Sequence, residues 1–220
     1  MRPGNDSHTD CMYLSKKNIQ AVCMQQEKKT NKARSEQTRA VLIDAARGLF
    51  ASAGYAETST PDIVRAAGVT RGALYHHFED KEALFVAVVT AEFQQVAAEI
   101  DASGQEAAAP VAALMAGSRA FLQAMQVPGR VRLLLLDGPA VLGRAEVDRI
   151  DRATSADTLR TGLAAAMAQG EIRTLPIEAL TVQLSALFDR AALAVAEGED
   201  PEVHLQVLDA LFAGLRPRAA

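Results

Sequence analysis

The segment AAGVTRGALYHHF, residues 66–78, gathers side chains that could contact duplex DNA. The guanidinium of Arg71 can donate two hydrogen bonds to the edge of a guanine, and the small residues Gly72 and Ala73 permit close approach or contact with a thymine methyl group. His76 would lie on the same outer surface. The residues whose donors suit phosphate oxygens are Tyr75, His77 and Lys81.

A metal site is the competing interpretation of two adjacent histidines. On a helix, His76 and His77 lie about 100° apart, and the chain has only four histidines, so no pair has the i, i+4 spacing that zinc sites use. We therefore expect no metal and no cofactor. No nucleotide-binding glycine loop, HExxH, GxSxG or Cys/His pair is present either, and we expect that the protein is not an enzyme.

Helical periodicity around this segment predicts the elements that position it. An apolar stripe predicts a first helix over residues 35–53 that ends at Gly54. Thr60 as N-cap, with Pro61 at the first helical position, predicts a second, short helix that ends at Gly68. Thr70 can cap a third helix that reaches about His76, and a long fourth helix starts in EDKEALF. Two short helices joined by a glycine turn predict a helix-turn-helix module.

Composition agrees with a helical protein. Of the 220 residues, 49% are hydrophobic, only 5% are aromatic and none is tryptophan, which favours an all-α fold over a β-sandwich. No stretch is as long and apolar as a membrane span or a signal peptide, so we expect a cytoplasmic protein without a membrane partner.

Charge is distributed unevenly. Residues 1–85 carry 12 Lys and Arg against 10 Asp and Glu, whereas residues 86–220 carry 11 against 17. Much of the positive charge lies in residues 1–34, which we interpret as a flexible basic leader; it is either a solvated tail or an arm that contacts phosphates. Cys11 and Cys23, both in this leader, are interpreted as incidental thiols, with a redox role left open.

Residues 35–93 resemble the N-terminal DNA-binding domain of the TetR/AcrR family of transcriptional regulators. The resemblance rests on LF…GY at the end of the first helix, IV..AGV in the second, ALYHHF in the third and DKEALF at the start of the fourth. It implies a helix-turn-helix domain over 35–85 and a helical ligand-binding and dimerisation domain over 86–220. Implied contacts with the DNA backbone are those of Thr58, Thr60, Tyr75, His77 and Lys81, and implied base contacts are those of Thr70, Arg71, Gly72, Ala73 and His76.

The pattern of the C-terminal part predicts further helices. One covers about 110–126, a short one lies in RVRLLLLDG and stops at Gly138-Pro139, and a long one covers 144–169. An effector pocket is expected between them, because methionines adapt to varied shapes and an acid can orient a ligand. The expected lining residues are Met115, Phe121, Leu122, Met125, Leu135, Leu136 and Asp137, each of which could instead be an ordinary core residue.

Two terminal helices carry wide apolar stripes, which either complete the core or form a dimer interface. The resemblance favours a four-helix bundle with a second copy, and the expected interface residues are Leu184, Leu187, Phe188, Ala191, Val195, Leu208, Leu211 and Phe212. The function expected from all this is a homodimeric repressor that binds an inverted-repeat operator and is released by a small, largely apolar effector. The alternative is an activator or architectural DNA binder without an effector.

Overall fold

The computed structural model describes residues 32–105 and 107–217 of the chain, and all regular structure in these ranges is helical. The basic leader and both cysteines therefore fall outside the described residues. The first described helix covers residues 32–53 and is here called the N-terminal helix. The remaining elements are α2 (Thr60–Ala67), α3 (Arg71–His77), α4 (Lys81–Gly104), α5 (Pro110–Met125), η1 (Arg132–Asp137), α6 (Gly138–Leu142), α7 (Arg144–Arg152), α8 (Ser155–Ala168), α9 (Ile177–Ala196) and α10 (Pro201–Gly214).

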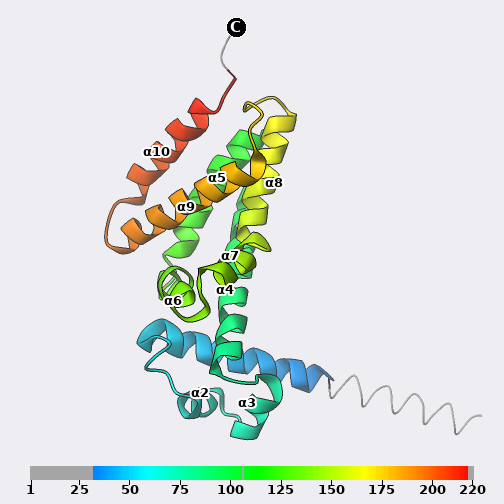
Figure 1. Cartoon of the computed structure of the whole chain (residues 1–220), viewed down its shortest axis with the longest axis vertical. Helices are drawn as coiled ribbons and strands as arrows, with labels where there is room; N and C mark the ends of the chain where they lie inside the picture. Colours follow the sequence, from blue (N-terminus) through cyan, green and yellow to red (C-terminus); the bar gives the residue numbers. More distant parts are fainter. Residues whose placement is uncertain (1–31, 106, 218–220) are drawn as a thin grey trace, which may run out of the picture.

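The molecule is elongated, with α2 and α3 at one end and α9 and α10 near the other (Figure 1). Helix α4 connects the two ends: its first part packs in the N-terminal domain, and the rest contacts α5 and α8. The expected boundary between residues 85 and 86 therefore falls inside one continuous helix. A movement of α4 would change how the two ends are oriented.

Local sequence signals explain the helix-turn-helix module. Gly68 ends α2 with φ of 65°, a left-handed conformation that glycine adopts without a steric penalty. The Thr70 hydroxyl accepts a hydrogen bond from the Ala73 N–H and caps α3, as expected. The cap of α2 is Ser59 rather than Thr60, because the Ser59 side chain accepts from the Asp62 N–H. Asp80 caps α4 in the same way through the Ala83 N–H.

An aromatic cluster holds the N-terminal domain together. The rings of Phe50 and Phe85 meet edge to face with centroids 5.1 Å apart, and Tyr55 lies 4.9 Å from Phe85. Around them pack fully buried Leu42, Ile63, Leu74 and Leu84. These residues come from the N-terminal helix and from α2, α3 and α4, so burial fixes the orientation of α3 relative to the rest of the domain.

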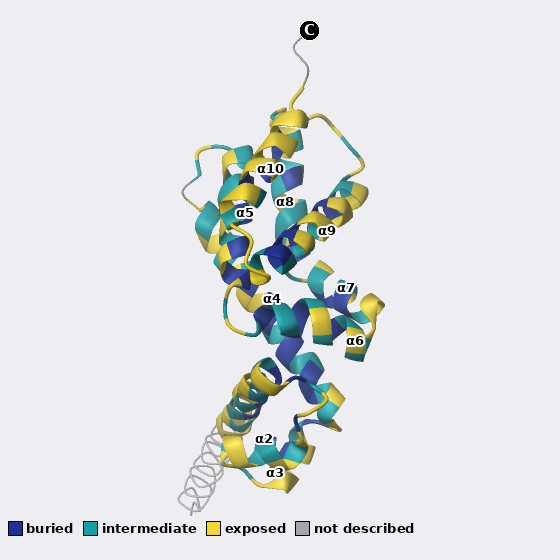
Figure 2. Ribbon diagram, turned by 90° about the vertical axis from the view of Figure 1, so that its left-hand side faces the viewer, coloured by how far each residue is buried: buried dark blue, intermediate teal, exposed yellow. Residues whose placement is uncertain are grey.

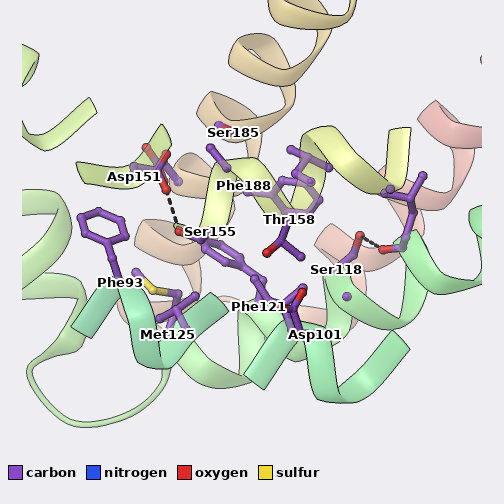
Figure 3. A pocket seen from close by; sticks show the side chains of 18 of the residues that line it. Phe93, Asp101, Ser118, Phe121, Met125, Asp151, Ser155, Thr158, Ser185 and Phe188 are labelled. Atoms are coloured by element: carbon purple, nitrogen blue, oxygen red, sulfur yellow. Dashed lines mark hydrogen bonds between the residues drawn. The ribbon is translucent and has the colours of Figure 1, made fainter. Parts of the chain in front are cut away.

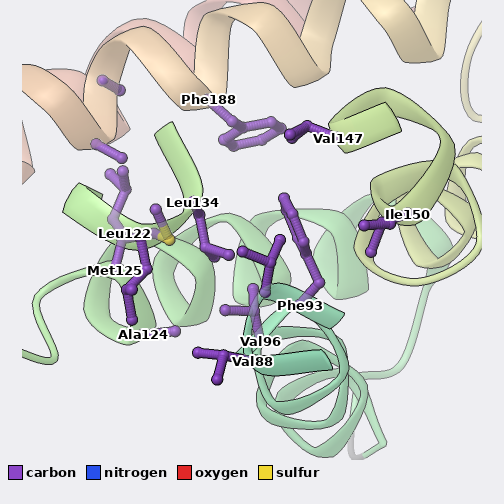
Figure 4. Close-up of a cluster of buried hydrophobic side chains, with 14 of the residues drawn as sticks. Val88, Phe93, Val96, Leu122, Ala124, Met125, Leu134, Val147, Ile150 and Phe188 are labelled. Atoms are coloured by element: carbon purple, nitrogen blue, oxygen red, sulfur yellow. The ribbon is translucent and has the colours of Figure 1, made fainter. Parts of the chain in front are cut away.

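The core continues into the C-terminal domain, where Val96, Leu122, Leu134, Ile150 and Phe188 bring side chains from five helical segments together (Figure 4). Two expectations fail in this region. The chain does not break at Gly138-Pro139, because η1 continues directly into α6. The helix expected over 144–169 is two helices, α7 and α8, separated at Ala153 and Thr154.

Candidate nucleic-acid interface and ligand cavity

Helix α3 presents a polar outer surface at the end of the molecule (Figure 2). Arg71, Gly72 and His76 are exposed along it, with Thr70 exposed at its N-terminus, and Ala73 is half-buried. The opposite side of α3 is fixed by Leu74, which is fully buried. The residues expected to contact bases therefore share one accessible surface, and this helix is narrow enough for the major groove of DNA.

Tyr75 links this surface to the start of α2. Its ring is 43% exposed, and the Arg71 guanidinium lies 5.4 Å from the ring centroid. Hydrogen bonding with the Thr60 hydroxyl, followed by that with Arg71, lowers the pKa of the Tyr75 phenol. Arg71 and Tyr75 are one helical turn apart on α3, and the packing of α2 against α3 adds Thr60 to this polar group.

Two of the expected phosphate contacts have other roles in the structure. Thr58 is only 3% exposed, and its hydroxyl donates to the Gly54 carbonyl at 2.7 Å. Its side chain is therefore turned into the protein and does not fit a contact with DNA. The Lys81 ammonium donates to the carbonyls of Tyr55 and Thr58 and lies 4.0 Å from the Tyr55 ring centroid. Lys81 thus holds the turn before α2 and has one N–H left for a phosphate.

His77 is half-buried beside His76. Burial, followed by the nearby charges of His76 and Arg39, lowers the pKa of His77 below its ordinary value. Burial and these charges thus favour the neutral imidazole, which can still donate a hydrogen bond to a phosphate through its ring N–H. In the described part of the chain, no group of three or more His, Cys, Asp and Glu residues is placed to hold a metal.

A cavity of about 240 Å³ lies inside the C-terminal domain between α4, α5, η1, α8 and α9. The rings of Phe93, Phe121 and Phe188 line it, and the rings of Phe121 and Phe188 meet edge to face (Figure 3). Of the expected lining residues, Phe121, Met125 and Leu135 do line this cavity. Its surface is mainly apolar, with a few polar side chains from α7, α8 and α9.

The other four expected lining residues lie elsewhere. Leu122 is 1% exposed in the core, and Met115 packs against the core without lining the cavity. Leu136 points to solvent with 52% exposure. Asp137 accepts a hydrogen bond from the Tyr55 N–H at 3.1 Å and lies 3.5 Å from Arg132, so it joins η1 to the N-terminal domain.

Two carboxylates on the cavity wall were missed by the pocket expected from sequence. Asp151 accepts a hydrogen bond from Ser155 at 2.6 Å, and burial is the main cause that raises its pKa. Burial, followed by the charge of Asp151, raises the pKa of Asp189 to about 6. No sequence signal distinguished these two from surface acids, because they come from α7 and α9 and only tertiary packing buries them.

The terminal helices divide their apolar residues between the core and the surface. Among the expected interface residues, five are buried within this chain: Leu184, Phe188, Ala191, Leu208 and Phe212. They complete the core of this chain. Leu187 and Leu211 are 45% and 41% exposed, and Val195 is half-buried. Further exposed apolar residues on α9 and α10 are Val182, Val203 and Val207.

By length and composition alone α4 and α9 could each cross a membrane, yet both contribute an apolar face to the core.

Comparison with known proteins agrees with this arrangement. Residues 42–88 match the family described as bacterial regulatory proteins of the tetR family, and residues 111–215 match the tetracyclin repressor-like C-terminal domain. A TetR-family transcriptional regulator from Pectobacterium atrosepticum has a similar structure, with 33% identity and a TM-score of 0.70; the match covers 86% of this chain and 98% of that one.

Two bacterial repressors resemble the chain over most of its length. The HTH-type transcriptional repressor Rv1474c of Mycobacterium tuberculosis is 29% identical over 178 residues, which is 81% of this chain and 92% of the relative. The HTH-type transcriptional repressor AcnR of Corynebacterium glutamicum is 28% identical over 189 residues, or 82% of this chain and 94% of that protein. Similarity thus extends beyond the helix-turn-helix module into the C-terminal domain.

Proposed function

The chain belongs to the TetR family of bacterial regulatory proteins and is a DNA-binding transcriptional regulator, and from this premise we propose that it is a homodimeric repressor released by a small effector. The effector is largely apolar and binds in the cavity, and the repressor acts in the cytoplasm on an inverted-repeat operator. One observation carries this proposal: η1 lines the cavity and also contacts the helix-turn-helix domain.

The proposed reading of DNA uses the exposed surface of α3 in the major groove. Base edges are contacted by Thr70, Arg71, Gly72, Ala73 and His76, all on or at the start of this helix. Thr60, Tyr75 and His77, together with the remaining N–H of Lys81, contact phosphates and set the register. Thr58 has no place in this proposal because its side chain is buried.

The proposed dimer pairs the exposed apolar residues of α9 and α10 with those of a second copy. Val203, Val207 and Leu211 recur every four residues and therefore lie on one face of α10. A two-fold axis through this interface would place the two copies of α3 about 34 Å apart, one turn of DNA, so that the dimer reads an inverted repeat.

The proposed release of DNA passes through η1. Leu134 and Leu135 of this segment line the cavity. Arg132, at its start, donates to the Ser52 carbonyl at 3.1 Å, and Asp137, at its end, accepts from the Tyr55 N–H. A ligand that favours a shifted position of η1 must also change the orientation of the turn between the N-terminal helix and α2. By thermodynamic linkage, bound DNA would lower the affinity for that ligand by the same factor by which the ligand lowers the affinity for DNA.

Selection of bound duplexes from a random DNA pool, followed by sequencing, tests the DNA-binding part of the proposal. We expect enrichment of an inverted repeat with half-sites one turn apart. Enrichment of a single half-site would contradict the dimer, and no enrichment by ligand-free protein at low salt would contradict sequence-specific repression. A thermal-shift screen of small molecules then identifies ligands, and the best of these should weaken binding to the selected operator.

Replacement of Arg132 by methionine tests the coupling. Arg132→Met keeps an apolar stem but removes the bond to Ser52 and the pair with Asp137, so we expect the ligand's effect on operator affinity to fall several-fold. Affinity for the ligand in the absence of DNA should change little. Arg149→Met is the matched control, because Arg149 pairs only with Glu146 on the exposed side of α7. An undiminished ligand effect in Arg132→Met would show that η1 does not transmit the signal.

A further inference from the structure

The charge pattern of the cavity restricts the ligands that it can accept. Among residues 32–105 and 107–217, its lining includes three carboxylates, Asp101, Asp151 and Asp189, and no Lys, Arg or His. The Ser118 hydroxyl already donates to the Leu114 carbonyl at 2.7 Å, and the Ser155 hydroxyl donates to Asp151. An anionic ligand would therefore enter an apolar cavity next to like charges and without a compensating cation.

Asp189 has a carboxylate oxygen free for a ligand. Its Oδ2 lies 3.4 Å from an Arg144 nitrogen, whereas its Oδ1 accepts no hydrogen bond from the described residues. Arg144 is itself 61% exposed and binds Asp148 more closely, at 2.8 Å. The contact between Arg144 and Asp189 is thus long and at the edge of the site, and a ligand cation on the cavity side could replace it.

A row of polar side chains on α9 leads to this carboxylate. Thr181, Ser185 and Asp189 are spaced four residues apart and therefore share one face of the helix. A more open hollow beside the cavity is lined by all three, and it shares Asp151, Ser185 and Asp189 with the cavity. Arg144, Arg152 and Arg160 also line this hollow, together with Asp148, Asp157 and Glu178, so its acids still outnumber its bases. Thr181 is 6% exposed, and its hydroxyl has no hydrogen-bond partner among the described residues. A buried hydroxyl without a partner is uncommon in folded proteins, and a water or a polar group in the hollow would satisfy it.

The apolar side of the cavity suits the body of a cationic ligand. Phe121 and Phe188 pack with ring centroids 5.5 Å apart, and Phe93 lies on the same wall (Figure 3). Aromatic rings attract cations through the negative charge on their faces, and they bind other rings by stacking. Acidic and aromatic side chains therefore line the same cavity.

We propose that the effector is a monocationic amphiphile, in which a protonated amine binds between Asp151 and Asp189 and an apolar or aromatic body fills the cavity. The ammonium donates hydrogen bonds to Oδ1 of Asp189 and to the Ser185 hydroxyl one helical turn away, while the body packs against Phe121 and Phe188. This inference rests on the proposed effector-responsive function, and it adds the chemical class of the effector.

Three probes of nearly equal size and shape test the charge preference: 4-phenylbutylamine, 4-phenylbutanol and 4-phenylbutyrate. Binding to the full-length protein is measured by calorimetry and by the increase in Tm. We expect the amine to bind about tenfold or more tightly than the alcohol, and the carboxylate to bind least, since a buried charged hydrogen bond is worth about 1.5–3 kcal/mol. Equal or tighter binding of the alcohol or the carboxylate, or no binding of the amine, would overturn the proposal.

Isosteric variants locate the amine. Asp189→Asn should lower the affinity for the amine about tenfold and leave the affinity for the alcohol within about twofold of the wild type. Asp151→Asn is a second test at the other side of the ammonium. Asp44→Asn is the matched control, because Asp44 is exposed on the N-terminal helix and lines neither the cavity nor the adjoining hollow. If the amine binds Asp189→Asn and Asp151→Asn as well as it binds the wild type, the ammonium does not occupy this site.

The pH dependence gives an independent readout. Burial and the charge of Asp151 raise the pKa of Asp189 to about 6, with Asp148 acting in the same direction and Arg144 opposing them. At pH 5 only about a tenth of Asp189 would be ionised, so the amine should bind about tenfold more weakly there than at pH 7.5, while the alcohol changes little. Equal amine affinity at both pH values would contradict the assignment. Operator binding is measured separately: an amine that binds as described but leaves DNA affinity unchanged would contradict effector release and not the ligand class.

Discussion

At the scale of single residues, the polar side chains of the helix-turn-helix module fall into two groups. Lys81 and Thr58 hydrogen-bond to backbone carbonyls of the turn before α2 and stabilise the module. Arg71 and His76 are exposed on α3 and remain free for a partner. Both groups contain residue types that suit DNA, and their spacing does not separate them. Only the contacts in the folded chain show that Thr58 is a structural residue.

Arg71 is the residue whose loss should change sequence preference most. Arg71→Ala removes a bidentate donor from the exposed start of α3, so we expect discrimination at one base pair to fall by about 1–3 kcal/mol. The measurement compares affinities for the selected operator and for variants with each base pair changed. Arg119→Ala is the control, because it removes the same charge from an exposed position on α5, where Arg119 pairs with Glu202. Equal losses on operator and random DNA would contradict base reading by Arg71.

Glu92 ties the two domains together, and its ionisation should make that tie sensitive to acid. Its carboxylate lies 3.2 Å from Arg47 of the N-terminal helix and 2.9 Å from Arg130, which is 3% exposed. Burial raises the pKa of Glu92, but hydrogen bonds and charge from Arg47 and Arg130 outweigh this, and the net pKa is lowered below its ordinary value of 4.5. The stabilisation is thus present above about pH 4.5 and is lost as the pH falls through the lowered pKa.

Replacement of Glu92 by glutamine tests this tie. Glu92→Gln should lower the free energy of unfolding at pH 7 by about 2 kcal/mol, because Arg130 stays buried with a weaker partner. The difference from the wild type, measured by urea unfolding, should shrink below about pH 4.5, where the wild-type carboxylate takes up a proton. Glu146→Gln is the control: Glu146 pairs with exposed Arg149, and its replacement should change stability little. A difference independent of pH would refute the role of the Glu92 charge.

At the scale of elements, the sequence predicted those helices whose ends carry a local signal, namely a capping side chain, a glycine turn or a proline at the first helical position. The glycine turn at Gly68, the Thr70 cap and the extent of α5 agree with their local signals. The separation of α7 from α8 has a weaker signal, since it lies in ATS, without glycine or proline. Local helix propensity does not determine whether the helix is interrupted there. The interruption is determined by packing of α7 against α6 and of α8 against α5.

The pocket was predicted less well because η1 does not have α-helical periodicity. Its hydrogen bonds join residues five apart, as between the Gly138 N–H and the Leu133 carbonyl, so each residue turns through a smaller angle than in an α-helix. Leu135, Leu136 and Asp137, all expected at the pocket, point in three directions: Leu135 lines the cavity, Leu136 faces solvent and Asp137 faces the N-terminal domain. Hydrophobic periodicity cannot reveal such a change, because all the neighbouring residues are leucines.

Gly129 shows how closely the segment after α5 packs on the N-terminal helix. Its φ is +79°, and an added Cβ would lie 2.3 Å from the Ala51 Cβ, too close for two carbons. Gly170 has φ of +70°, and nothing lies within 4 Å of its added Cβ. An alanine at Gly170 would therefore introduce backbone strain without a steric clash. We expect Gly170→Ala to lower the free energy of unfolding by about 1–2 kcal/mol and Gly129→Ala by about 1–3 kcal/mol more.

Urea unfolding of both variants measures this difference. Equal losses would mean that the domains adjust at Ala51 without penalty, and the junction would then be looser than its contacts indicate. A larger loss in Gly129→Ala would show that this junction is packed tightly enough to transmit a displacement of η1 to the N-terminal helix. The comparison therefore bears on the coupling as well as on stability.

At the scale of the whole molecule, the regions proposed for DNA contact, ligand binding and self-association follow one another along the molecule. Helix α3 lies at one end, and α9 and α10 lie near the other end (Figures 1 and 2). The cavity is lined by α4, α5, η1, α8 and α9 of the C-terminal domain. Helix α4 and the junction around η1 connect the first two regions. Residues on α9 such as Ser185 and Phe188 line the cavity, while Leu187 on the same helix is exposed. A ligand could therefore change the spacing of two α3 helices without contacting either of them.

Oligomeric state provides the last test, because the inverted repeat requires two copies. The double variant Val207→Asp/Leu211→Asp places two charges on the exposed face of α10. In the single chain Val207 is 55% exposed and Leu211 is 41% exposed. Folding of the monomer should survive, but burying two unpaired carboxylates in a dimer would be strongly unfavourable, so we expect monomers in sedimentation equilibrium. Leu136→Asp is the control, since Leu136 is exposed on η1, away from α9 and α10. If the double variant remains dimeric, α10 is not at the interface; if it is monomeric yet binds the complete operator with wild-type affinity, the two half-sites are not read by a dimer.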